Sequence, residues 1–110
     1  MTPGPDRAPS AGGVLEHAIL EVGAERADEF EAAFARAAPI IAAADGFGSL
    51  RLGRCLERPG RYVLLVEWAT IEDHTEGFRG SEGYGQWRRL LHHFYDPFPT
   101  VEHYAVVRTA

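Results

Sequence analysis

The segment Arg61–Trp68 (RYVLLVEW) constrains the fold of this chain more than any other stretch. It consists largely of β-branched, leucine and aromatic residues, and it follows a Pro59-Gly60 pair that supplies a turn, so it favours a strand. Alternate side chains of a strand point to opposite faces, and both sets here are largely apolar: Tyr62, Leu64, Val66 and Trp68 on one, Val63, Leu65 and Glu67 on the other. The strand therefore belongs in a sheet that is covered on both faces.

Three other segments predict strands by the same reasoning. Residues 14–22 (VLEHAILEV) end at Gly23, residues 48–57 (GSLRLGRCLE) precede the Pro59-Gly60 turn, and residues 100–108 come last. In the first segment one face carries Val14, Ala18, Leu20 and Val22, and the other carries Leu15, His17 and Ile19.

Residues 25–44 predict a helix, because apolar side chains recur there at helical spacing: Phe30, Ala33, Phe34, Ala37 and Ile41. Pro39 lacks a backbone donor and crowds the preceding turn, so we expect a kink or break near Ala38. The Asp45-Gly46 pair then ends the helix.

Two helical segments lie between the strand at 61–68 and the last strand. Thr70 caps the first, which starts at Ile71, with Asp73 at the third helical position. The glycines of the segment 77–83 separate it from a second helix over residues 84–94. The second helix has an apolar face of Tyr84, Trp87, Leu91 and Phe94, and Asp96-Pro97-Phe98-Pro99 ends it.

The order of elements is therefore β-α-β-β-α-β, which predicts an α+β, ferredoxin-like fold with one four-stranded antiparallel sheet and helices on one face. The other face carries Val63 and Leu65, together with Leu15 and Ile19 of the first strand. Such a face is too apolar for water, and a second copy of the sheet can cover it. We expect a two-fold homodimer joined through this face.

Length and charge limit the possible functions. At 110 residues the chain is one domain, for which we expect residues 14–110, preceded by a mobile tail rich in Pro, Gly and Ala over residues 1–13. The net charge of −5 argues against a nucleic acid or an anionic membrane as partner. No apolar run suits a signal peptide or a membrane span, and the single Cys55 fits a reducing cytoplasm.

Residues 66–104 hold both tryptophans and four of the five histidines. Aromatic faces interleaved with imidazoles and arginines suit a pocket for a flat organic molecule, so a small aromatic molecule is the expected ligand. No GxGxxG, phosphate-loop or GxSxG motif is present, and we predict no cofactor.

His74 and Arg79 are the predicted catalytic residues. His74 shares a helix face with Phe78, four positions on, so the imidazole points toward the apolar interior. A group that titrates near neutrality can take a phenolic proton, and the fixed charge of Arg79 can stabilise the resulting anion. The alternative reading is that His74 is a hydrogen-bonded structural group and that Arg79 is solvated.

Seven residues are predicted to contact the substrate: Trp68, Phe78, Tyr84, Trp87, Leu91, Tyr95 and His103. His17 and His103 lie on strands that are neighbours in a ferredoxin-like sheet, so they can face each other as a pair. His92 is expected on the surface. No HxH or HxxxH spacing occurs among the histidines, and we predict no metal site.

From Val14 to about Arg108 the chain resembles the antibiotic biosynthesis monooxygenase (ABM) superfamily, also called dimeric α+β-barrel proteins. The resemblance is carried by the strand end with Trp68 in LLVEWATIEDH, by FRGSEGYGQWRRLL, by the ADGF turn and by the closing PTVEHY. It implies a pocket in each subunit between the sheet and its helices, with Trp68 at its wall.

The resemblance also implies a reaction. Cofactor-independent members oxidise a phenol, a dihydroquinone or a polyketide-like aromatic, whose anion passes an electron directly to dioxygen. Known monooxygenases of the superfamily carry an Asn shortly before the tryptophan, whereas this chain has Leu64 and Leu65 there and no Asn anywhere. Two alternatives remain: a ligand-binding or structural dimer without turnover, and a haem-binding or haem-degrading protein with His74 on the iron.

Overall fold

The computed structural model describes residues 13–110 of the chain. Its four strands are β1 (Val14–Glu21), β2 (Phe47–Arg54), β3 (Arg61–Trp68) and β4 (Val101–Ala105), and its two long helices are α1 (Ala27–Ala42) and α2 (Glu82–Leu91). Short helical turns are η1 (Ala24–Arg26), η2 (Asp73–Phe78) and η3 (His92–Phe94). The mobile tail predicted for residues 1–13 falls, except for Gly13, outside the described residues.

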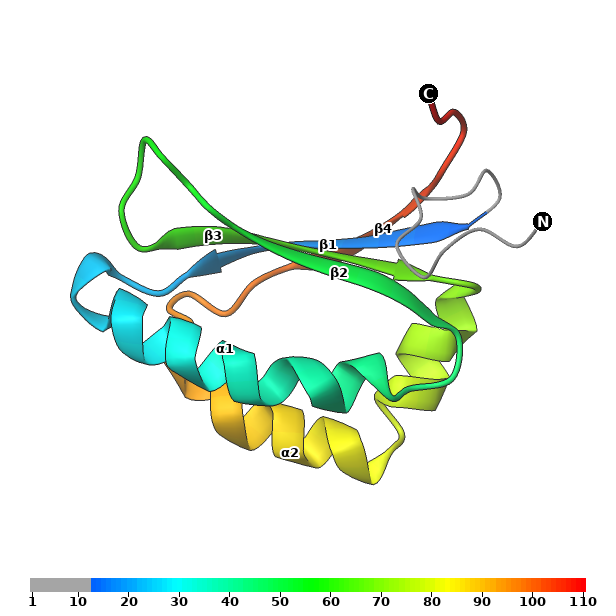
Figure 1. The fold of residues 1–110 in the computed structure, drawn as a ribbon, viewed down its shortest axis with the longest axis horizontal. Coiled ribbons are helices and arrows are strands. Elements are labelled where there is room, and N and C mark those ends of the chain that lie inside the picture. Colours follow the sequence, from blue (N-terminus) through cyan, green and yellow to red (C-terminus); the bar gives the residue numbers. More distant parts are fainter. Residues whose placement is uncertain (1–12) are drawn as a thin grey trace.

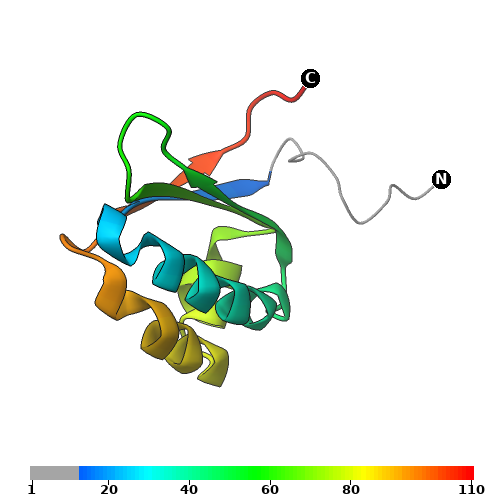
Figure 2. The same ribbon diagram turned by 60° about the vertical axis from the view of Figure 1, so that its left-hand side comes forward.

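The strands form one antiparallel sheet in the order β2-β3-β1-β4, and both long helices lie against the same face of it (Figure 1, Figure 2). This confirms the predicted α+β, ferredoxin-like arrangement with a four-stranded antiparallel sheet. The pairing of β1 with β4 places Glu16 opposite His103, and its pairing with β3 places Val14 opposite Trp68. These pairings bring His103 of β4 and Trp68 of β3 next to the same end of β1, where Glu16 stands.

Gly60 closes the predicted turn between β2 and β3. Its φ of +88° lies in the left-handed region, and a Cβ there would come within 2.3 Å of the carbonyl carbon of Gly23. The close approach lets the Gly60 carbonyl accept a hydrogen bond of 2.9 Å from the Val22 amide. Only glycine allows the hairpin to dock against the end of β1.

Helix α1 buries all five of the side chains predicted for its inner face, Phe30, Ala33, Phe34, Ala37 and Ile41. The predicted break near Ala38 is wrong, because the helix continues through Pro39 to Ala42. Pro39 stands in the last turns, where the loss of one backbone donor affects little of the helix, and the burial of Ala37 and Ile41 holds these turns against the core.

The segment after β3 begins with the predicted cap. Thr70 Oγ1 accepts a hydrogen bond of 3.1 Å from the Asp73 amide, and the Asp73 carboxylate accepts one of 3.1 Å from the Thr70 amide. From Asp73 to Phe78, however, η2 is wound as a π-helix, with the Arg79 amide donating to the His74 carbonyl five residues earlier at 3.1 Å. The wider winding decides where Arg79 lies.

The face of the sheet away from the helices is uncovered in the single subunit (Figure 2). Leu15, Val63 and Leu65 are half-buried there and Ile19 is 36% exposed. The predicted homodimer through this face remains a prediction. Within residues 13–110, no helix combines the length and apolar character that crossing a membrane requires.

Candidate functional site

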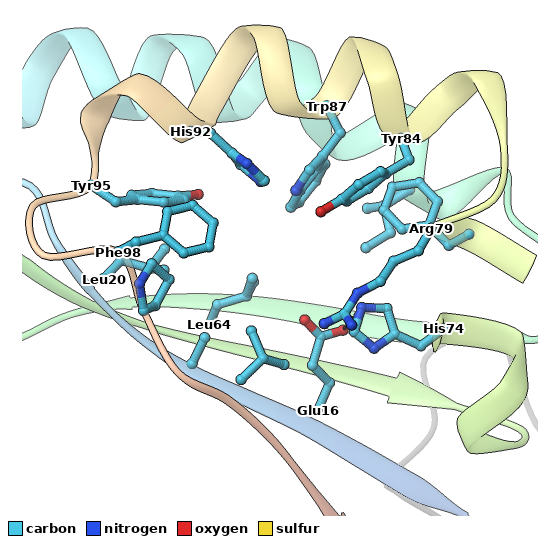
Figure 3. Close-up of a pocket in the computed structure, with 15 residues that line it drawn as sticks. Glu16, Leu20, Leu64, His74, Arg79, Tyr84, Trp87, His92, Tyr95 and Phe98 are labelled. Atoms are coloured by element: carbon cyan, nitrogen blue, oxygen red, sulfur yellow. Dashed lines mark ion pairs between the residues drawn. The ribbon is translucent and has the colours of Figure 1, made fainter. Parts of the chain in front are cut away.

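A cavity of about 70 Å³ lies between the sheet and helix α2. Figure 3 shows side chains from the sheet, from η2, from α2 and from the loop after η3 pointing into one space. The apolar part of its floor comes from Ala18 and Leu20 of β1 and Leu64 of β3. The lining consists of Glu16, Ala18, Leu20, Ile41, Leu64, His74, Phe78, Arg79, Tyr84, Trp87, His92, Tyr95, Phe98, Pro99 and Val101.

Two groups of aromatic rings form the walls. The Phe78 ring meets those of Tyr84 and Trp87 edge to face, with centroids 5.5 and 5.8 Å apart. At the opposite end His92 and Phe98 have centroids 4.9 Å apart. Edge-to-face packing fixes these rings and leaves their remaining surfaces to a planar ligand.

Glu16 forms the polar end of the cavity together with residues of η2. It stands on β1 among the inward-facing residues of the sheet and is 5% exposed. The Trp68 indole Nε1 donates a hydrogen bond of 2.9 Å to Glu16 Oε1, and His74 Nε2 lies 3.4 Å from the same oxygen. A buried carboxylate requires such partners, because an unpaired charge in an apolar interior is costly.

His74 is held on three sides and is 4% exposed. Its Nδ1 lies 2.8 Å from Nε2 of His103, so one of the two nitrogens carries a proton and donates it to the other. Its ring stacks on the Trp68 indole, with centroids 5.3 Å apart and planes 17° apart. Glu16, His74 and His103 therefore form a continuous chain of polar groups.

Arg79 reaches the same end of the cavity because of the π-helical turn. In an α-helix, residues five apart point about 140° away from each other. In η2 the hydrogen bond from the Arg79 amide to the His74 carbonyl brings the two residues onto one side. Figure 3 shows the Arg79 guanidinium beside the Glu16 carboxylate and the His74 ring. Arg79 otherwise remains exposed to solvent.

Burial sets the protonation of this cluster. Burial raises the pKa of the Glu16 carboxyl, while the Trp68 hydrogen bond and the charge of Arg79 counter the rise. Burial, and then the charges of Arg79 and His103, lower the pKa of His74 to about 3. The pKa of His103 is lowered by burial and by Arg79 as well. Both imidazoles are therefore neutral at pH 7, and the positive charge at the site belongs to Arg79.

The aromatic end of the cavity is also held neutral. Burial raises the pKa of the Tyr95 hydroxyl, to which the charge of Glu16 contributes next. Burial and the charge of Arg88 lower the pKa of His92. A ligand in the cavity thus meets neutral hydrogen-bonding groups at the aromatic end and the charge of Arg79, close to the Glu16 carboxyl, at the polar end.

The structure brings six of the predicted site residues together at the cavity: His74, Phe78, Arg79, Tyr84, Trp87 and Tyr95. Trp68, Leu91 and His103, which were predicted to contact the substrate, do not line it. Trp68 and Leu91 are almost fully buried in the core behind the lining, and His103 reaches the site only through His74.

Two expectations about histidines are wrong. His17 does not face His103, because the register of β1 and β4 pairs His17 with Glu102 and puts His103 opposite Glu16 on the helix-facing side. His17 instead packs edge to face on Tyr104, on the uncovered face. His92 is not on the surface but half-buried at the cavity wall, because η3 turns its ring inward toward Phe98.

Glu16 was not among the predicted site residues. The strand alternation nevertheless puts Glu16 on the same face as Ala18 and Leu20, which are buried. An acid in the middle of an apolar strand face is expensive unless a partner satisfies it, so it marks a candidate site. Its partners could not be read from local spacing, because Trp68 lies 52 residues away.

Haem does not fit these residues. An iron ligand needs a free imidazole nitrogen, but His74 Nδ1 contacts His103 and its Nε2 faces Glu16. The cavity of about 70 Å³ is also far smaller than a porphyrin requires. Among residues 13–110, no cluster of three or more His, Cys, Asp or Glu side chains is arranged to hold a metal ion.

The fold and the cavity define a small α+β protein with a partly aromatic site between a sheet and its helices. The sequence profile of the antibiotic biosynthesis monooxygenase (ABM) family matches residues 14–90. The chain belongs to this family.

Relatives extend over most of the chain. YczJ of Bacillus subtilis, an uncharacterized protein, is 54% identical over 91 residues, which are 83% of this chain and 96% of YczJ. A Bordetella bronchiseptica protein whose structure carries the same family name is 35% identical, with a TM-score of 0.82, over 88% of this chain and 99% of its own. SnoaB of Streptomyces nogalater, a cofactor-independent oxygenase, is 25% identical in a variant form, with a TM-score of 0.70, over 90% of this chain and 97% of its own.

Proposed function

We propose that this protein is a cofactor-independent monooxygenase that oxidises a small, electron-rich aromatic substrate, a phenol or quinol, in the cavity between the sheet and α2. The observation that supports it most is the polar end of the cavity, where a buried carboxylate, a neutral imidazole and an arginine meet beside aromatic walls. The likeness to SnoaB, a cofactor-independent oxygenase, supports the same reaction class.

The substrate can supply all the electrons that the reaction needs. A quinol that becomes a hydroxyquinone loses four electrons, which reduce one dioxygen molecule completely. One oxygen atom enters the product, and the other leaves as water with the two hydrogens lost by the substrate. The protein has to bind the substrate, remove a hydroxyl proton and stabilise the anion, which then passes an electron to dioxygen.

The residues divide these tasks by position. Phe78, Tyr84 and Trp87 hold the ring, and the neutral Tyr95 hydroxyl donates a hydrogen bond to a substrate oxygen. Arg79 stabilises the anion, and His74 belongs to the group that handles the proton. Trp68, Leu91 and His103 act from behind the lining, which they support.

The cavity is smaller than a single substrate ring requires. An engineered cavity of about 150 Å³ binds benzene, so a cavity of about 70 Å³ admits even one ring only if side chains move, and a polycyclic, polyketide-like substrate needs a larger movement. Arg79 and Phe98 are exposed and can move with little loss of packing. We further propose that the protein works as a homodimer in the cytoplasm, a compartment that its single cysteine fits.

Dioxygen consumption tests the function. Purified protein is mixed with hydroquinone, methylhydroquinone and a tricyclic anthrone, and uptake is followed with an oxygen electrode after treatment with a chelator. With ¹⁸O₂, one labelled atom should appear in the product and one in water. The His74→Ala variant should lose most of the uptake while keeping its circular dichroism spectrum.

The exposed His93 provides a matched control, and His93→Ala should leave the rate unchanged. Binding of quinols without any protein-dependent uptake would instead assign the protein to ligand binding without turnover. Unchanged turnover in His74→Ala would remove that residue from the mechanism.

A further inference from the structure

We propose that Glu16 is the catalytic base of this site, with Oε2 as the atom that accepts the hydroxyl proton of the substrate, and that His74 and His103 are positioning residues that hold the other oxygen, Oε1, in place. The inference rests on the proposed function. The proposed proton acceptor is thus Glu16 on strand β1, whereas the sequence suggested His74 on the helical turn.

The two oxygens of Glu16 are used differently. Both close contacts, with Trp68 Nε1 at 2.9 Å and His74 Nε2 at 3.4 Å, are made to Oε1. Within residues 13–110, no hydrogen bond engages Oε2, and Oε2 is not among the buried polar atoms sealed off without a partner. Glu16 lines the cavity, and Figure 3 shows its carboxylate rising from the sheet into the space beside Arg79. Oε2 is therefore the oxygen available to a ligand.

His74 is poorly placed to be the acceptor. Its Nδ1 is occupied by His103 at 2.8 Å, and its Nε2 faces Glu16 Oε1 at 3.4 Å. Burial and Arg79 lower the pKa of His74 to about 3, whereas burial raises the pKa of Glu16. Of the two groups, the carboxylate thus has the greater affinity for a proton. A general base works best when its pKa approaches the operating pH.

The transfer moves one negative charge by a short distance. The O–H bond of the substrate breaks, its electron pair stays on the substrate oxygen, and a new O–H bond forms at Oε2. Before the step Arg79 faces the Glu16 carboxylate, and after it Arg79 faces the substrate anion. The site keeps the same net charge throughout, so the step needs little reorganisation in a buried setting.

His74 and His103 hold Glu16 in place and do not take its proton. His74 Nε2 lies 3.4 Å from Oε1, the oxygen that does not accept the substrate proton, and His103 contacts His74 from the edge strand β4. The proton on Oε2 passes to the reduced dioxygen, so the substrate hydrogen leaves in the water molecule.

The test separates deprotonation from oxidation. Nitrohydroquinone, whose anion absorbs visible light, is added without dioxygen at a pH one unit below the pKa of the free compound. Wild-type protein should show the spectrum of the anion at saturation. The Glu16→Gln variant, whose amide oxygen still accepts from Trp68, should bind the compound in its neutral form.

Glu67 provides a matched control, because it is a second glutamate that is 7% exposed in the sheet, but it does not line the cavity. Glu67→Gln should generate the anion as the wild type does. An anion spectrum in Glu16→Gln equal to that of the wild type would overturn the inference. No binding of the compound by the wild type would overturn it as well.

Admission of dioxygen then tests the proposed function independently. If the anion forms but the protein does not increase dioxygen uptake, Glu16 remains the proposed base and the proposed monooxygenase function is refuted. If the proposed base and the proposed function both hold, Glu16→Gln should lower the rate of dioxygen uptake by about 10²- to 10⁴-fold. Its rate should recover at a pH above the pKa of the substrate, since the anion then forms without a base. A rate that stays low at high pH would mean that Glu16 is only structural.

The positioning residues have a separate readout. In the wild type, kcat/KM should fall on the acidic side through one ionisation, that of Glu16. His74→Gln removes the group beside Oε1, so the acidic limb should shift along the pH axis while some activity remains. An acidic limb that does not move in His74→Gln would show that the imidazole does not act through Glu16.

Discussion

The Trp68 indole donates a hydrogen bond of 2.9 Å to Glu16 Oε1 from the end of the neighbouring strand. The same indole supports the His74 ring by stacking on it. One side chain thus fixes both the carboxylate and the imidazole of the site while lying almost completely buried behind them. The tryptophan acts on the site through its contacts rather than as part of the cavity wall.

Replacing Trp68 by Phe should destabilise the protein. The buried Glu16 carboxylate would lose its donor, which costs about 1–3 kcal/mol in addition to the lost packing. Urea unfolding at pH 7 measures the loss. Trp87→Phe is the control, since within residues 13–110 the Trp87 indole makes no hydrogen bond. A loss in Trp68→Phe no larger than that in Trp87→Phe would contradict the importance of the bond.

Acidification should destabilise the fold through His74. Its pKa is about 6.5 in the unfolded chain and about 3 in the fold, so the unfolded chain binds more protons between these values. The stability due to this group is complete above pH 6.5 and is lost as the pH falls toward 3. The slope is at most about 1.4 kcal/mol per pH unit. The raised pKa of Glu16 has the opposite effect just above pH 4.5, where the folded protein binds more protons than the unfolded chain and gains stability as the pH falls.

Urea unfolding from pH 7 to pH 4 checks this dependence. His74→Gln should show a shallower decline than the wild type, because the substituted side chain binds no proton in either state. An equal decline in stability for the two proteins would mean that His74 takes up its proton in the fold at the same pH as in the unfolded chain.

Replacing Arg79 by Gln should raise the pKa of His103. The guanidinium charge is, after burial, the second cause of the lowered value, and the variant removes only that cause. NMR titration of the imidazole protons measures the shift. Arg89→Gln, an exposed arginine of α2, should leave His103 unchanged. An unaltered His103 titration in Arg79→Gln would place the guanidinium away from the cluster.

Introducing Arg at Val63 should separate the predicted dimer. Val63 lies opposite Ile19 on the uncovered face, and a charge there would be buried without a partner if two sheets meet. Sedimentation should show a dimer for the wild type and a single subunit for Val63→Arg. Ala32→Arg, on the exposed side of α1, should remain dimeric. A wild type that sediments as a single subunit would refute the predicted interface.

Local patterns predicted much of the fold. The capping pair of Thr70 and Asp73 and the burial of His74 with Phe78 follow from spacings of a few residues, and the structure has both. The predicted break near Ala38 was wrong, because packing of the neighbouring turns outweighs the one hydrogen bond lost at Pro39. The π-helical turn was not foreseen, since its wider winding has no distinct residue pattern.

The sequence by itself determined the order of strands and helices, the inner face of each and membership of the family, because these depend on residues close together in the chain. Only the tertiary structure decided which polar groups meet. The register of β1 and β4 turns His103 toward Glu16 and away from His17, and a shift of one residue would reverse this choice. Long-range strand pairing sets that register, and no local spacing in the sequence records it.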